Sequence, residues 1–82
     1  MHHAVQAAIA RFPDRGHAIA ELATADDGFL SLCEDLVEAQ EAVLHWERST
    51  SPLGAARSDE YRELVKELVA ELERTLDRST GA

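Results

Sequence analysis

The stretch FLSLCEDLVEAQEAVLHW, residues 29–46, carries the strongest structural signal in the chain. Its apolar residues advance by three and four positions alternately, which places them along one side of a helix: Phe29, Leu32, Leu36, Ala39, Val43 and Trp46. Such a narrow apolar line is typical of a helix that packs lengthwise against another helix. The stretch therefore predicts one long helix that needs a helical partner.

A second periodic segment can supply that partner. It has a similar spacing of residues, in Tyr61, Val65, Leu68, Leu72 and then either Thr75 or Leu76. Residues 49–54 between the two segments read STSPLG, and serine, proline and glycine favour turns. We therefore expect an antiparallel helical hairpin of two long helices, residues 25–48 and 58–78, with Trp46 and Tyr61 stacked beside the loop.

Residues 4–23 predict one or two short helices ahead of this hairpin. Pro13 interrupts the first of them, because proline disfavours helical geometry at the preceding residue but fits the first turn of a new helix. Thr24, followed by two aspartates, resembles a capping box at the start of the first long helix, and Ser58 predicts the cap of the second. The 82 residues thus predict a single small all-α domain, residues 1–82.

A second apolar row runs beside the first on the central helix, in Leu30, Cys33, Val37 and Leu44. It widens the apolar surface beyond what one partner helix covers. Either the short N-terminal helices cover it within the chain, or a second subunit completes a four-helix bundle. A chain of this size has a thin core and oligomerisation is a common remedy, so we take the row as a candidate interaction face.

The chain is acidic, with 16 acidic and 8 basic residues and a formal net charge of −8. An acidic face follows one side of the central helix, in Asp27, Glu34, Glu38 and Glu41. It is either an ordinary solvated face or a docking surface for a basic partner. No segregated basic patch is visible, so we expect no nucleic-acid partner. No apolar run has the length of a bilayer and no secretory signal is visible, so we expect a cytoplasmic protein without a membrane partner.

Histidines and carboxylates raise the possibility of a metal site. His17 and Glu21 are four residues apart, as are Glu41 and His45, and each pair could face one way from a helix. Two ligands do not make a site, so a metal would require His17, Glu41 and His45 to meet between subunits. His2 and His3 predict adventitious binding only. We expect no metal and no cofactor.

Other reactive residues point away from catalysis. The single cysteine, Cys33, excludes an internal disulfide and predicts a buried thiol. The serines lack a neighbouring histidine and acid, and no glycine-rich phosphate loop is present, so an enzyme is not expected. The leading hypothesis is a non-enzymatic interaction or assembly module that binds a protein partner or itself, most simply as a homo-oligomer. The alternative is a small metal- or ligand-binding helical bundle.

The segment from Phe12 to Leu32 has the pattern FPDxxxxIxxLxxxxxxFxSL. With this pattern the chain resembles the YdcH-like family of short bacterial proteins, over roughly residues 12–76. The family's second helix is rich in lysine, whereas Lys66 is the one lysine of this chain. The resemblance implies a small helical hairpin with no established activity and no known cofactor, and it implies no catalytic residue.

Overall fold

The computed structural model describes residues 2–80, and every regular element in that range is helical. The prediction of an all-α protein is confirmed. The elements, in chain order, are α1 (His3–Arg11), a 3-10 turn (Pro13–Arg15), α2 (Gly16–Ala25), α3 (Asp27–Glu47) and α4 (Gly54–Thr80).

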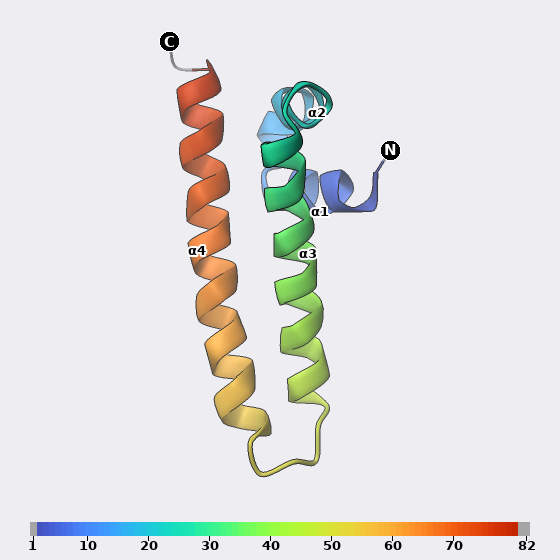
Figure 1. Ribbon diagram of the computed structural model, residues 1–82, viewed down its shortest axis with the longest axis vertical. Coiled ribbons are helices and arrows are strands. Elements are labelled where there is room, and N and C mark those ends of the chain that lie inside the picture. The colour runs from blue at the N-terminus through green and yellow to red at the C-terminus, as the bar shows by residue number, and fades with distance from the viewer. Residues whose placement is uncertain (1, 81–82) are drawn as a thin grey trace.

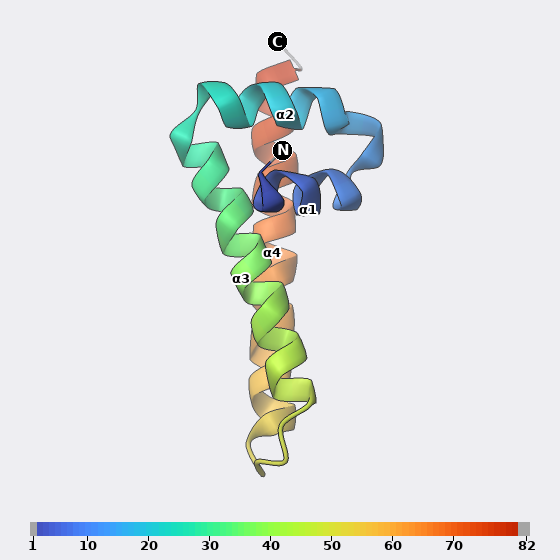
Figure 2. The same cartoon turned by 90° about the vertical axis from the view of Figure 1, so that its right-hand side faces the viewer.

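The two long helices pack closely, and the two short helices cross one end of them. Figure 1 shows α3 and α4 side by side along the long axis, joined at their lower end by residues 48–53. Figure 2 shows α1 and α2 lying across the upper half of this pair. The molecule measures 47 × 23 × 21 Å. Among residues 2–80, the lower half contains α3, α4 and the loop that joins them, so side chains beside the contact line of these two helices have no third helix over them.

Pro13 separates α1 from α2, as the sequence predicts. Phe12 leaves helical geometry with φ −129° and ψ 67°, which is the bias that a following proline imposes. The Arg15 N–H then donates to the Phe12 carbonyl at 3.0 Å and closes the 3-10 turn. A Cβ on Gly16 would lie 3.3 Å from Cγ2 of Ile9, so glycine allows α1 and α2 to approach closely at their corner.

The first long helix begins later than expected, because a different residue caps it. Asp26 is extended, with φ −136° and ψ 105°, and its Oδ1 accepts from the N–H groups of Gly28 (2.9 Å) and Phe29 (3.2 Å). The Thr24 hydroxyl instead donates to the Ala20 carbonyl at 3.0 Å, within the last turn of α2. The predicted cap at Thr24 is therefore wrong, and the boundary lies at Asp26.

The last helix begins earlier than expected, at Gly54 rather than at Ser58. Ser58 is buried inside the helix, and its hydroxyl donates to the Ala55 carbonyl at 3.0 Å. The loop serines supply the turn: Ser49 Oγ accepts from the Ser51 N–H, and Ser51 Oγ accepts from the Leu53 N–H, both at 3.1 Å. Because these bonds complete the loop before Gly54, α4 gains a turn that the sequence pattern did not indicate.

The core lies in the upper half, where all four helices meet. Its fully buried large side chains are Ile19, Cys33, Leu36, Leu72 and Leu76. Val5 and Ala8 of α1 and Phe29 of α3 belong to the same cluster. An ion pair of 2.7 Å between Arg15 Nη1 and Asp77 Oδ1 links the start of α2 to the end of α4 at the surface.

Candidate functional site

The four residues of the predicted interaction face do not share one accessible surface. Cys33 and Val37 are buried in the chain's own core, and Leu30 is half-buried against it. Leu44 has 48% of its surface exposed. The reason is that α1 packs across α3 in the upper half (Figure 2). The chain itself covers the upper part of the second apolar row, and the accessible part is reduced to Leu44.

The uncovered lower half holds the exposed large apolar residues of the described chain. Leu44 lies on α3, Leu64 on α4 is 39% exposed, and Leu53 in the connecting loop is 55% exposed. Single exposed leucines are common on protein surfaces. Leu44 and Leu64 differ from Leu53 because each lines a groove between the two long helices.

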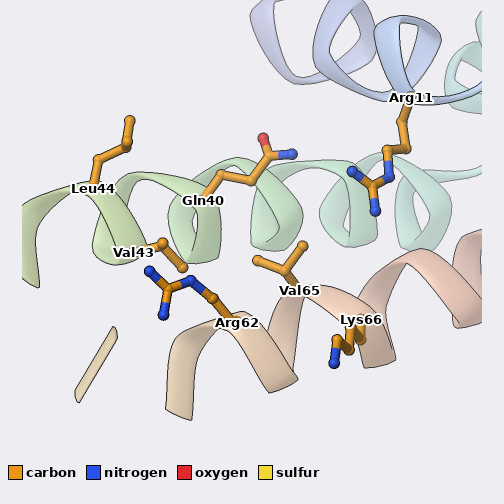
Figure 3. A pocket seen from close by; sticks show the side chains of 7 residues that line it. All are labelled: Arg11, Gln40, Val43, Leu44, Arg62, Val65 and Lys66. Carbon is orange, nitrogen blue, oxygen red and sulfur yellow. The ribbon is translucent and has the colours of Figure 1, made fainter. Parts of the chain in front are cut away.

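The first groove, called here the basic groove, has a volume of about 510 Å³ and lies between α3 and α4 just below α1 (Figure 3). Its lining combines apolar side chains with three cations, in Arg11, Gln40, Val43, Leu44, Arg62, Val65 and Lys66. Val43 and Val65 lie between the two long helices, while Leu44 points away from α4 at the edge of the groove (Figure 3). Arg11 comes from the end of α1, and Arg62 and Lys66 come from α4. Three of the chain's eight basic residues thus gather at one place.

The three cations differ in how far their charge is compensated. Arg62 forms ion pairs with Glu47 on α3 and, at 2.7 Å, with Asp59 on its own helix. Its hydrogen bond to Glu47 is the main reason why the pKa of Arg62 is raised. Lys66 Nζ lies 3.9 Å from Glu63 Oε1, and Arg11 forms no ion pair with any residue in the described range. Arg11 and Lys66 therefore supply most of the groove's available positive charge.

The second groove, called here the acidic groove, has a volume of about 360 Å³. Its lining combines apolar residues with two carboxylates, in Asp35, Glu38, Ala39, Ala42, Tyr61, Leu64 and Leu68. At 3.6 residues per turn, the α3 residues of the two grooves lie on opposite sides of the line that contacts α4. Neither Asp35 nor Glu38 forms an ion pair within residues 2–80. The charged residues that line the two grooves are therefore of opposite sign, three cations in one and two carboxylates in the other.

All four residues of the predicted acidic face are exposed. Asp27, Glu34, Glu38 and Glu41 all lie at the surface of α3. Glu34 Oε2 lies 3.6 Å from His2 Nε2, while the other three have no ion-pair partner in the described part of the chain. Glu38 also lines the acidic groove, so one member of the face borders an apolar surface.

The histidines do not gather into a metal site. His17 Nε2 lies 3.1 Å from Glu21 Oε1 on exposed α2, while Glu41 and His45 lie near the far end of α3. Within residues 2–80, no group of three or more histidine, cysteine or acidic side chains could hold a metal ion together. His2 instead caps α1, because its Nδ1 accepts from the Ala4 N–H at 3.0 Å. That structural role was not expected from the sequence.

Cys33 is buried, as the sequence predicts, and burial is the main reason why its pKa is raised to about 11. The nearby charge of Glu34 acts in the same direction. Because the thiolate is the nucleophilic form, this cysteine is poorly suited to covalent chemistry near neutral pH. The expected stacking of Trp46 on Tyr61 is wrong: the ring of Trp46 meets His45 edge to face, with centroids 5.1 Å apart.

The basic groove was missed because its cations come from both ends of the sequence. Arg11 reaches it only through the path of α1 across α3, which no local pattern specifies. The sequence of the last helix contains part of this pattern. Arg62 and Lys66 are four residues apart, so they share one side of the helix, and Val65 lies next to that side. That spacing indicates two cations beside an apolar position.

Two further observations bear on the class of protein. In residues 2–80, no helix has the length and apolar character that crossing a membrane requires. A comparison of the chain with models of known protein families, with characterised proteins and with solved structures finds no match.

Proposed function

We propose that this protein is a non-enzymatic interaction module that binds a helical segment of a protein on the lower half of its α3–α4 hairpin. The observation that carries the proposal is the pair of grooves beside Leu44 and Leu64, where neither short helix covers the long ones. An amphipathic helix binds such a groove by placing apolar side chains at successive turns into it.

The composition of the grooves supports this function. Each combines a floor of aliphatic side chains with charged residues at its edge, which is the arrangement of an interface with an apolar centre and a polar rim. The central apolar side chains would supply affinity, while the charged rim would select the partner and speed association.

A small metal- or ligand-binding bundle is the other function that the sequence suggested. Within one chain the described residues do not bring its proposed ligands together, because His17 and His45 lie on different helices at opposite ends of the molecule. The resemblance of residues 12–76 to the YdcH-like family remains a proposal of the same kind, and it is compatible with an interaction module because it implies no chemistry.

The test compares three leucine-to-glutamate substitutions that are alike in chemistry. Leu44→Glu and Leu64→Glu place a charge in a groove, whereas Leu53→Glu places it in the loop, on a side chain that is at least as exposed. Affinity-tagged chains are cross-linked in the native host, and the protein bound per chain is quantified by mass spectrometry. Both groove variants should bind at least about tenfold less than the wild type, which corresponds to about 1.4 kcal/mol.

The loop variant should bind as the wild type does, and far-ultraviolet circular dichroism should show unchanged helix content in all three. Equal binding by the groove variants and the loop variant would overturn the proposal. So would a wild-type chain that retains neither another protein nor a second copy of itself.

A further inference from the structure

We infer that the basic groove binds a second copy of this chain, which presents its own acidic groove. The inference rests on the proposed function, because it names the partner for the surface assigned there. Both halves of the contact are visible in one molecule: a basic rim around Val43 and Leu44, and an acidic rim beside Ala42 and Leu64.

The rims are complementary in charge. Arg11 and Lys66 border one groove, and Asp35 and Glu38 border the other without an ion pair in the described range. The net charge of −8 makes copies repel each other at long range. At physiological ionic strength charges are screened over about 8 Å, so opposite charges in contact act after the overall repulsion has faded.

The apolar floors supply the second part of the contact. Leu44 and Leu64 are each partly exposed in the single chain. When the basic groove of one copy faces the acidic groove of the next, Leu44 of the first copy and Leu64 of the second copy both lose exposed surface. Burial of apolar surface favours association. The charged rims then fix which side of one copy meets which side of the next.

The access route also favours this arrangement. α1 and α2 lie across the upper half of the long helices, and Arg11 at the end of α1 marks the upper edge of the basic groove (Figures 2 and 3). A second copy therefore reaches the groove from the loop end, where the lower half consists of two helices only.

The contact has a definite symmetry. It joins two different surfaces, so each copy in a pair still has one groove free. Such a heterologous contact continues into open chains or closes into a ring, whereas a symmetric dimer would stop at two copies. The average mass in solution should therefore rise past the dimer as the protein concentration increases.

The test is analytical ultracentrifugation of the purified full chain and of two charge-reversal variants. The basic-rim variant is Arg11→Glu with Lys66→Glu, and it leaves the Arg62–Glu47 pair between the long helices intact. The acidic-rim variant is Asp35→Lys with Glu38→Lys. Each variant alone should associate at least about tenfold more weakly than the wild type. An equimolar mixture of the two should associate again, because the acidic-rim variant keeps an intact basic groove and the basic-rim variant keeps an intact acidic groove.

Charge-matched controls separate the rims from net charge. Arg57→Glu with Arg74→Glu and Glu67→Lys with Glu73→Lys change the net charge by the same amounts outside both grooves, and both should associate as the wild type does. The acidic-rim variant lowers the overall repulsion between copies, so its loss of association cannot arise from net charge.

A wild-type chain that stays monomeric up to about 1 mM would overturn the inference, since that concentration covers weak specific contacts. So would association that the rim variants leave unchanged. If the purified chain is monomeric but Leu44→Glu removes a different bound protein, the proposed function stands and the self-contact fails. If no protein of any kind binds, both fail.

Discussion

At the scale of single residues, burial separates two side chains that the sequence places on one apolar row. Val37 is 8% exposed beneath the packing of α1 on α3, whereas Leu44, about two turns further along α3, is 48% exposed. The same type of substitution should therefore have different effects at the two positions, which makes the pair a test of where the chain covers itself.

Val37→Glu should lower the free energy of unfolding by about 3 kcal/mol or more, because it buries a carboxylate without a partner. Leu44→Glu should change it by no more than about 0.5 kcal/mol, because the new carboxylate remains in water. Urea unfolding followed by circular dichroism measures both values. A similar small loss at both positions would show that α1 does not cover Val37 in solution.

At the scale of the helices, one cap sets the boundary between α2 and α3. Asp26→Ala should lower the free energy of unfolding by about 1 kcal/mol, because two N–H groups at the start of α3 lose their acceptor. Thr24→Ala should stay within about 0.5 kcal/mol, because Thr24 bonds a carbonyl inside α2. Urea unfolding of the two variants, with Asp26→Asn as a capping-competent control, checks the difference. If Thr24→Ala lowered the free energy of unfolding more than Asp26→Ala, the start of α3 would lie at the position that the sequence predicted.

The presence of the helices was predictable, and the starting residues of the two long ones were not. The spacing of three and four residues between apolar positions continues over many helical turns. The long helices are therefore recognisable even where a single turn could be assigned in more than one way. A boundary depends on one side chain among several capable ones: Thr24 and Asp26 are both capping residues, and Ser58 resembles a cap until the loop serines complete the turn before it.

The sequence could not predict which helix buries the second apolar row of α3. Its burial depends on contacts between α1 and α3, and periodicity cannot distinguish a helix of the same chain from a helix of a second subunit. The basic groove has the same origin, because Arg11 meets Lys66 only after α1 has crossed α3. The acidic residues, by contrast, follow one helix and were visible in its sequence.

At the scale of the whole molecule, the buried core and the proposed binding surface lie at opposite ends. The upper half buries side chains from four helices, including Phe29, Leu36 and Leu72. The lower half has two helices, a cross-helix ion pair of Arg62 with Glu47, and half-buried apolar residues beside the grooves. Local opening requires the loss of fewer buried contacts in the lower half, so the two halves should differ in local stability.

Hydrogen exchange followed by mass spectrometry should show that difference. At low protein concentration, amides in residues 40–47 and 56–64 should have protection factors at least about tenfold below those in residues 30–37 and 68–76, because they can open without disrupting the four-helix core. Equal protection in both halves would mean that the molecule opens only as one unit. Protection of the lower half should rise with concentration in the wild type and stay constant in the rim variant Arg11→Glu with Lys66→Glu, because a second copy covers those turns only when the basic groove can bind it.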